Sequence, residues 1–380
     1  MFRHFKWISL ALALVLLTSV SAAAQNERRE LRFFLPFIPN IQFAPVYVAI
    51  ANGYFAEEGL DVVVEYGDEN VAVDLLAANE LQFGMISGEQ VILARAGGRP
   101  VVYVYQWFQQ FPVGVVVPDT SGVAAPEDLA GRRIGIPGLF GASYTGIVAL
   151  LGSAGLAESD VQLEPIGFVA PDVVCAGGVE VSVVYVNNEP LQIQQRADAG
   201  ECGDITAVDV IYIGDYVDLV SNGITTNEQT IAEDPELVAA VVRAFDKGLR
   251  DTINNPAQAY LLSRDFVEDL PIDEAFVALL EEQAAAQTEF LATEPDRAAI
   301  TESRAALEAA LSEAVDPQLL IQFRVLLATI ALWDADDLGV TDAYAWTTTQ
   351  DALLTVGALR ETTDLEGAFT NEFIPVAESE

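Results

Sequence analysis

Short apolar runs alternate with longer amphipathic segments over the first half of the chain. An apolar run at residues 31–37 is followed by a turn at 38–40 and an amphipathic segment that ends at Asn52 and Gly53. A second apolar run follows at 61–66, so this segment predicts one strand–helix–strand unit. In open α/β sheets, ligands bind where the carboxyl end of a strand faces the amino end of a helix. The segment 43–60 is therefore the first candidate for a ligand-binding wall.

The alternation continues in two blocks. In the first block we expect helices at 68–79 and 89–96 and strands at 81–87 and 101–105. After an apolar run at 113–117 the pattern restarts, and in the second block we expect short helices at 126–129 and 143–151, and strands at 133–136, 161–166, 179–185 and 205–213. Strands that alternate with helices predict a mostly parallel sheet. From Thr230 onward the apolar periodicity is mainly helical.

Two similar α/β blocks predict two lobes around a cleft. We expect lobe I to comprise residues 31–118 and about 214–380, including the C-terminal helices, and lobe II to comprise residues 119–213. The fold class is thus α/β with a helical C-terminal region. A chain of 380 residues is long enough for two such units, each with its own core.

The amino-terminal segment has the pattern of a secretory signal peptide. Arg3 and Lys6 precede an apolar stretch at 8–20, and small residues at 22–24 form a cleavage site, so we expect residues 1–24 to be removed. An uncleaved membrane anchor is disfavoured because the apolar stretch is short for a spanning helix. We therefore expect an exported protein that is periplasmic or associated with the cell surface, and the absence of a cysteine near the cleavage site leaves its means of retention open.

Charge and rare residues exclude several functions. The net charge is −39, and loss of the signal would make it −41, so nucleic acids and anionic membranes are disfavoured partners. The single histidine, His4, lies in the signal, which excludes Ser–His–Asp and Cys–His nucleophiles in the mature chain. Cys175 and Cys202 are too few for a Cys/His metal site and are as compatible with a disulfide as with two free thiols. We expect no metal and no cofactor.

The candidate binding residues lie at the carboxyl ends of the predicted strands in both lobes. Aromatic faces there suit stacking on a flat ring, and side-chain amides and carboxylates can read its edge by paired hydrogen bonds. Each residue taken alone is also compatible with a core, cap or turn role, and only their joint position at strand ends favours a site. The candidates are Gln42, Phe43, Tyr47, Ser87, Glu89, Gln106, Trp107, Ser143, Tyr144, Tyr185, Asn187 and Glu189.

Three motifs resemble one family of solute-binding proteins. NGYFAEEGLDV (52–62), FGMISGEQ (83–90) and VVYVNNEP (183–190) are similar to ABC-importer solute-binding proteins, in the branch that binds thiamin pyrimidine precursors or riboflavin. The C-terminal pattern resembles the same branch through Trp333, Gly339, Asp342, Trp346, Asp351, Gly357 and FTNEF (369–373). The resemblance implies a two-lobed type II periplasmic-binding-protein fold and a monomer that captures a small ligand and docks on a membrane permease.

The resemblance leaves the ligand open. An aminopyrimidine would favour a carboxylate such as Glu89 or Glu189, because that pairing is bidentate and charge-assisted. A flavin would favour neutral amides such as Gln42, Gln106 or Asn187 and a longer aromatic slot. A pyrimidine synthase shares the fold, but it uses an active-site histidine and a cysteine-rich iron site, which this chain lacks. A structural or adhesive surface protein is the remaining alternative.

Overall fold

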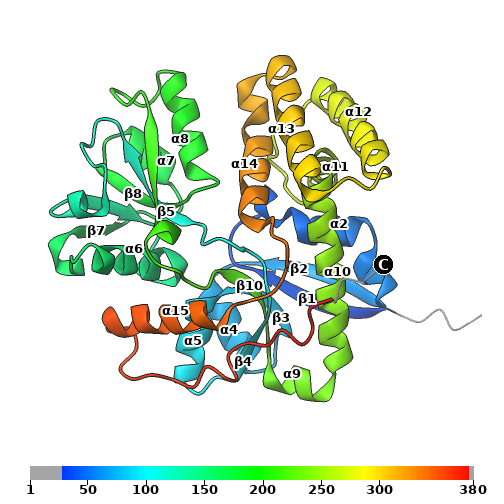
Figure 1. Ribbon diagram of the computed structural model, residues 1–380, viewed down its shortest axis with the longest axis horizontal. Helices are drawn as coiled ribbons and strands as arrows, with labels where there is room; N and C mark the ends of the chain where they lie inside the picture. The colour runs from blue at the N-terminus through cyan, green and yellow to red at the C-terminus, as the bar shows by residue number, and fades with distance from the viewer. Residues whose placement is uncertain (1–27, 376–380) are drawn as a thin grey trace, which may run out of the picture.

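Two five-stranded sheets form the centres of two lobes in the computed structural model, which describes residues 28–375 (Figure 1). The predicted signal peptide lies outside the described residues. In the first sheet the strand order is β2-β1-β3-β10-β4. Its strands are β1 (Arg29–Leu35), β2 (Leu60–Tyr66), β3 (Phe83–Ser87), β4 (Val101–Gln106) and β10 (Asn222–Asn227).

The second sheet has the order β7-β6-β8-β5-β9. Its strands are β5 (Val113–Pro118), β6 (Arg133–Ile136), β7 (Gln162–Pro165), β8 (Val181–Tyr185) and β9 (Val208–Tyr212). Because β5 pairs with β8 and β9, the second unit begins near residue 113 by this criterion, earlier than the boundary at 119 expected from the sequence.

Each sheet is mixed rather than fully parallel. In the first sheet β10 runs antiparallel to β3 and β4, and in the second β5 runs antiparallel to β8 and β9. Both antiparallel strands directly follow a crossing between the lobes. A strand that arrives from the other lobe enters its sheet from the opposite end, because no crossover helix turns the chain around first. The remaining strands run parallel, as predicted.

Helices cover both sheets (Figure 1). The first lobe contains α2 (Ala44–Ala51), α3 (Tyr54–Glu57), α4 (Glu69–Ala77), α5 (Gly88–Ala96), α9 (Glu228–Glu233), α10 (Pro235–Asn254) and α11 (Pro256–Ser263). The second lobe contains α6 (Gly141–Ser153), α7 (Ala170–Cys175) and α8 (Glu189–Asp198). The C-terminal region adds α12 (Glu274–Leu291), α13 (Arg297–Ala314), α14 (Pro317–Trp333) and α15 (Ala343–Thr355). Within residues 28–375, no helix is both long and apolar enough to cross a membrane.

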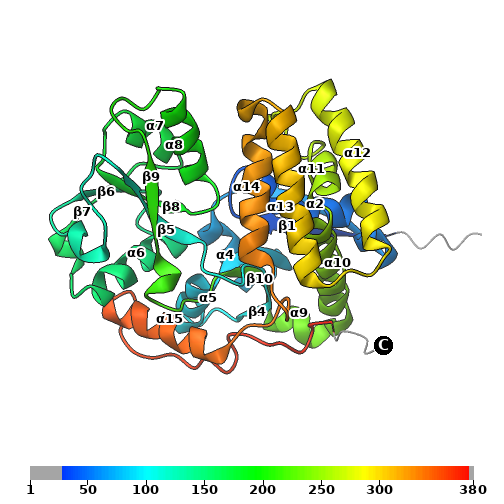
Figure 2. The same cartoon turned by 45° about the horizontal axis from the view of Figure 1, so that its top comes forward.

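The two lobes have separate hydrophobic cores, and C-terminal helices contact both lobes. Phe33, Tyr105 and Phe245 belong to the largest core of the first lobe, whereas Val115 and Ile147 belong to a core of the second. Helix α15 contacts α5 of the first lobe and α6 of the second, and Figure 2 shows it along the lower edge of the molecule, beneath the second lobe and beside α5. Separate cores allow each lobe to move as a unit, while α15 and the crossing segments limit the movement.

The only two cysteines of the chain are joined in the second lobe. Cys175, at the end of α7, forms a disulfide with Cys202, which follows α8. Of the two states that the sequence left open, the structure contains the bridged one.

Candidate ligand-binding site

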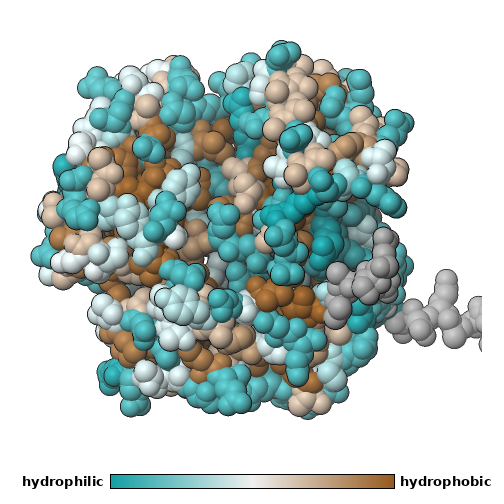
Figure 3. Space-filling model, in the orientation of Figure 1, coloured by the Kyte–Doolittle hydropathy of each residue, from teal (hydrophilic) through white to brown (hydrophobic). Residues whose placement is uncertain are grey.

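A cavity of about 320 Å³ lies between the two lobes. This volume is at the lower end of the range of small-molecule pockets. Figure 3 shows a groove between the second lobe and the C-terminal helices at the top of the view. The cavity is lined by Pro36, Phe37, Ile38, Gln42, Phe43, Gly67, Asp68, Glu69, Trp107, Phe108, Pro137, Phe140, Gly141, Ala142, Ser143, Phe168, Tyr185, Asn188, Glu189 and Asn222.

The first lobe contributes residues that follow its parallel strands. Phe37 follows β1, Glu69 opens α4 after β2, and Trp107 follows β4. Gln42 and Phe43 lie in a short 3₁₀ turn that Asn40 caps through its side chain. Because the carboxyl ends of parallel strands meet at one edge of a sheet, these side chains gather on one wall.

The second lobe provides the facing wall by the same rule. Pro137 follows β6, Phe168 follows β7, and Tyr185 ends β8 just before Glu189 opens α8. The turn into α6 passes through Gly141, whose φ of +69° lies in the left-handed region that favours glycine. Both walls are therefore built from strand ends and helix amino termini, as the sequence predicted.

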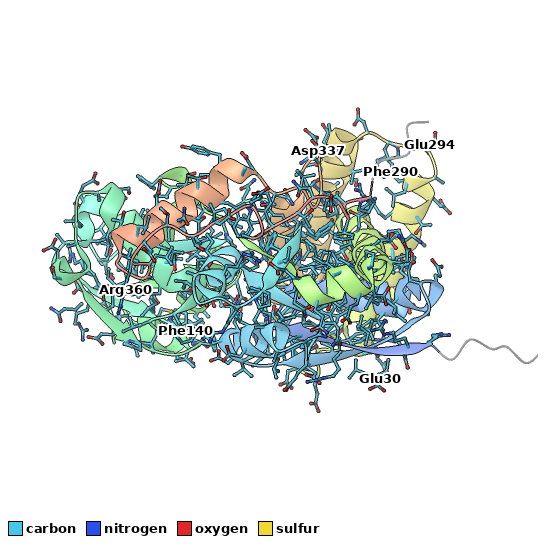
Figure 4. All side chains as sticks on the ribbon, turned by 90° about the horizontal axis from the view of Figure 1, so that it is seen from below. Glu30, Phe140, Phe290, Glu294, Asp337 and Arg360 are labelled. Carbon is cyan, nitrogen blue, oxygen red and sulfur yellow. A yellow bond between two sulfur atoms is a disulfide. The ribbon has the colours of Figure 1, made fainter. Side chains whose placement is uncertain are left out.

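Aromatic side chains dominate the cavity. Seven of its lining residues are Phe, Trp or Tyr: Phe37, Phe43, Trp107, Phe108, Phe140, Phe168 and Tyr185. The Trp107 ring stacks between Phe43, at 5.8 Å between centroids, and Trp333, at 5.5 Å. Figure 4 shows Phe140 between the second lobe and the amino-terminal elements of the first. Such walls suit a flat, aromatic ligand.

Polar contacts join the lobes beside the cavity. The Asn187 side chain, from the second lobe, donates its amide to Gln42 Oε1 at 2.8 Å and to Thr329 Oγ1 of α14 at 2.7 Å. The Tyr185 hydroxyl donates to Asn222 Oδ1 at 3.1 Å. Asn187 is 1% exposed, so its contacts are shielded from water. These contacts hold the two walls together around the cavity.

Three acidic residues line the cavity, Asp68, Glu69 and Glu189, and the carboxyl group of Glu89 lies behind that of Glu69. Burial raises the pKa of Glu189 to about 7, although its carboxylate accepts the backbone N–H of Tyr185 at 3.0 Å. Burial also raises the pKa of Glu69, whose Oε1 accepts the Ser87 hydroxyl at 2.7 Å. The same hydroxyl bonds to Glu89, which is 1% exposed, and burial together with the charge of Glu69 raises the pKa of Glu89 to about 8. No Lys, Arg, His or Cys lines the cavity, and residues 28–375 contain no cluster of ligands for a metal ion.

Half of the residues predicted for the site line the cavity. They are Gln42, Phe43, Trp107, Ser143, Tyr185 and Glu189.

Three predicted residues lie directly behind this lining. Ser87 and Glu89 support Glu69, and Asn187 supports Gln42. Their predicted contact with a ligand is untested, and the structure places them in the layer that orients the lining residues.

The other three predicted residues point elsewhere. The Tyr47 hydroxyl contacts that of Tyr66 at 2.9 Å, and its ring stacks on Phe266. The Tyr144 hydroxyl donates to Glu158. Gln106 lines a second cavity, beside the two segments that cross between the lobes. Partners outside the cavity lining hold the hydroxyl groups of Tyr47 and Tyr144, whereas the Gln106 side chain donates to the backbone carbonyl of Phe108.

Sequence reasoning missed Glu69, Phe37, Phe140, Phe168 and Asn222. Glu69 was hidden within a predicted helix, although its position at the first turn after β2 follows the rule used for the other candidates. Phe140 lies in the turn between β6 and α6, close in sequence to the predicted residue Ser143. Asn222 opens a strand that arrives from the other lobe, and no local signal marks that crossing.

Comparisons with known proteins agree with this architecture. Residues 40–259 match the family described as NMT1/THI5 like. The riboflavin-binding protein RibY of Chloroflexus aurantiacus is 34% identical, over 93% of this chain and 88% of its own length. A formylaminopyrimidine-binding protein of Halalkalibacterium halodurans is 30% identical, over 68% of this chain and 77% of its own. A 4-amino-5-hydroxymethyl-2-methylpyrimidine phosphate synthase of Legionella pneumophila is 22% identical, over 63% of this chain and 74% of its own.

Among solved structures, a Candida albicans protein described as having the generic periplasmic binding protein fold covers 92% of this chain and 98% of its own. Its TM-score is 0.56 at 16% identity, which shows the same fold. The type of fold that the sequence motifs implied is therefore confirmed. With more than half of its length matched by the family model and a relative of 34% identity along nearly all of it, the chain belongs to the NMT1/THI5-like family.

Proposed function

We propose that this protein is the extracytoplasmic solute-binding protein of an ABC importer and that its ligand is riboflavin. The observation that carries the proposal is the cavity between the lobes, whose lining includes seven aromatic side chains and no basic one. The three-ring system of a flavin offers a long apolar face to such walls. Stacking on one good aromatic partner contributes about 0.5–1.5 kcal/mol beyond the burial of area.

The relative named for riboflavin supports the same ligand. RibY matches at higher identity and over more of the chain than the relative named for formylaminopyrimidine. The polar groups of the cavity suit the edge of a flavin, since Gln42, Asn188 and Asn222 are neutral side-chain amides.

A thiamin pyrimidine precursor is the second candidate ligand. Glu69 and Glu189 line the cavity and can each form a bidentate pair with an amidine edge. At Glu189 the raised pKa weakens this candidate, because a neutral carboxyl lacks the charge that strengthens such a pair. At Glu69 one carboxylate oxygen already accepts the amide and the hydroxyl of Ser87, so a bidentate pair would have to compete with these bonds.

A binding role fits this chain better than the synthase alternative. The two relatives named for binding match at higher identity and over more of the chain than the synthase does. The cavity lining contains no His or Cys that could act as a nucleophile or an iron ligand. We further propose export by the predicted signal peptide, a monomeric state and docking of the closed form on a membrane permease.

Thermal-shift measurements with riboflavin and with an aminopyrimidine test the proposal. A ligand present at about 100 times its dissociation constant adds about 2.7 kcal/mol to the free energy of unfolding. We expect riboflavin to raise the melting temperature and the aminopyrimidine to compete weakly at most. A shift with the aminopyrimidine alone would establish the second candidate, and no shift with either would refute the vitamin assignment.

A further inference from the structure

Ser87 lies between two carboxyl groups at the edge of the cavity. It is the last residue of β3 and is fully buried. Its backbone N–H donates to Glu69 Oε1, and its Oγ lies 2.7 Å from the same oxygen. The same Oγ is also hydrogen-bonded to Glu89 Oε1.

These contacts need more protons than the serine supplies. A hydroxyl carries one hydrogen, and an ionised carboxylate can only accept. With two carboxyl oxygens against one hydroxyl, one carboxyl group must carry a proton and donate it to Ser87 Oγ. Glu69 Oε1 already accepts the Ser87 amide, so it is the acceptor of the hydroxyl as well. The proton therefore belongs on Glu89.

We propose that Glu69 is a specificity-determining carboxylate of the cleft, and that Glu89 is a neutral positioning residue that orients it through Ser87. This inference rests on the proposed function, since it assigns the group that reads the ligand. The hydrogen-bond chain runs from the Glu89 carboxyl to Ser87 Oγ and from the Ser87 hydroxyl to Glu69.

The second oxygen of Glu69 is directed into the cleft. Glu69 lines the cavity, and its Oε2 lies 3.5 Å from the point that a Cβ on Gly141 would occupy. Gly141 opens α6 of the second lobe, so this oxygen faces the other wall across the cleft. Between residues 28 and 375 it has no hydrogen-bond partner, which leaves it to accept an N–H from the edge of a heteroaromatic ring.

The surrounding charges favour a single negative charge on the pair. Asp68 precedes Glu69, and Tyr103, Tyr185 and Glu189 are the other titratable groups around the two carboxyls. None of them is basic, so a second negative charge beside Glu69 would have no counter-ion. Burial and the charge of Glu69 accordingly raise the pKa of Glu89 to about 8.

Titration of riboflavin fluorescence from about pH 6 to pH 9 tests the inference with three proteins. For the native protein we expect affinity to fall as pH rises above about 8, by up to roughly tenfold per pH unit, because ionised Glu89 no longer donates to Ser87. Glu89→Gln keeps an N–H donor and carries no charge. We expect the affinity of this variant to be within about threefold of the native value at pH 7 and to lose this pH dependence. Any pH dependence that remains in the variant measures the titration of the flavin itself. Glu69→Gln should weaken binding at least about tenfold at pH 7.

Two results of the riboflavin titration would overturn the inference: native affinity in Glu69→Gln, or an unchanged pH profile of binding in Glu89→Gln. Infrared spectroscopy of the ligand-free protein provides a readout that does not depend on riboflavin. It should show a protonated-carboxyl C=O band at pH 7 that Glu89→Gln removes, and a native protein without this band would also refute the inference. If the band is present but riboflavin does not bind, the proposed function fails and the proton assignment stands.

A further variant, Ser87→Ala, tests the positioning role even if Glu89→Gln does not fold. Ser87→Ala removes the hydroxyl between the two carboxyl groups while it keeps the backbone N–H to Glu69. We expect weaker riboflavin binding at pH 7, and native affinity in a folded Ser87→Ala protein would contradict the positioning role.

Discussion

The Phe37 ring of the first lobe meets the Phe168 ring of the second edge to face, at 4.8 Å between centroids and 86° between planes. Both residues line the cavity, and Phe168 is 57% exposed, so the contact lies at the mouth of the cleft. Phe37 follows β1, an inner strand of the first sheet, and Phe168 follows β7, an edge strand of the second. This pair is therefore an apolar contact between the lobes, and it lies at the opening by which a ligand would leave the cleft.

Removal of this contact should shorten the lifetime of the complex. An edge-to-face pair contributes about 0.5–1.5 kcal/mol, so Phe168→Ala should increase the rate of riboflavin release about two- to tenfold. Stopped-flow fluorescence after dilution of the complex measures this rate. Val169→Ala is the matched control, because Val169 is also exposed but does not line the cavity. Equal release rates in the two variants would contradict a role for the aromatic contact.

The contact between Asn187 and Gln42 should matter more for affinity than for stability of either lobe. Asn187→Ala removes two buried hydrogen bonds that join the lobes, to Gln42 and Thr329. A buried group left without its partner costs about 1–3 kcal/mol, so calorimetric titration should show affinity for riboflavin about 5- to 100-fold weaker. Gln194→Ala, which removes exposed hydrogen bonds within the second lobe, should bind like the native protein. Native affinity in Asn187→Ala would show that the lobes close without this contact.

The buried acids predict a decline of stability toward alkaline pH. Folding raises the pKa of Glu89 from 4.5 to about 8, so the folded state holds a proton that the unfolded state has released. The free energy of unfolding should therefore fall as pH rises from about 4.5 to about 8, with a slope of at most roughly 1.4 kcal/mol per pH unit from this group. Urea unfolding of the ligand-free protein at a series of pH values measures the slope.

Two variants separate the contributions to this slope. Glu89→Gln should flatten it between pH 7 and 8, whereas Glu189→Gln should act mainly below pH 7, because the pKa of Glu189 rises only to about 7. An unchanged slope above pH 7 in Glu89→Gln would mean that Glu89 is ionised in the folded protein.

The disulfide should stabilise the second lobe without affecting the site. Cys175 and Cys202 are 27 residues apart, and neither lines the cavity. Replacement of both by Ser should lower the free energy of unfolding by about 2–4 kcal/mol and leave riboflavin affinity within about twofold of native. Thermal unfolding and a riboflavin titration measure the two quantities. A loss of affinity larger than the loss of stability would indicate that the bridge shapes the cleft.

Sequence periodicity was sufficient for every strand except β10, which it did not predict, and for much of the cavity wall. Gln42, Trp107 and Tyr185 line the cavity because the carboxyl ends of parallel strands meet at one edge, a rule that needs only the order of elements. Ser87 and Glu89 also lie at a strand end, but their side chains turn behind the wall to reach Glu69. Strand-end position predicts proximity to the site and does not predict which side chain reaches the ligand.

The contacts between lobes could not be read from the sequence. Phe168 and Asn222 take part in the site only because the second lobe rests against the first, and that placement depends on how the two crossings and α15 hold the lobes. Tyr144 shows the opposite case, because it follows the predicted pattern but donates its hydroxyl to Glu158 outside the cleft. Local patterns do not encode these competing partners.

A fluorescence titration of riboflavin with the native protein and with Trp107→Leu tests whether the aromatic cleft binds the vitamin. Trp107 lines the cavity and stacks between Phe43 and Trp333. We expect saturable quenching of flavin emission by the native protein, with one riboflavin bound per chain, and weaker binding by Trp107→Leu. Unquenched emission over the full titration, or equal affinity in a folded Trp107→Leu protein, would contradict riboflavin binding in the aromatic cleft.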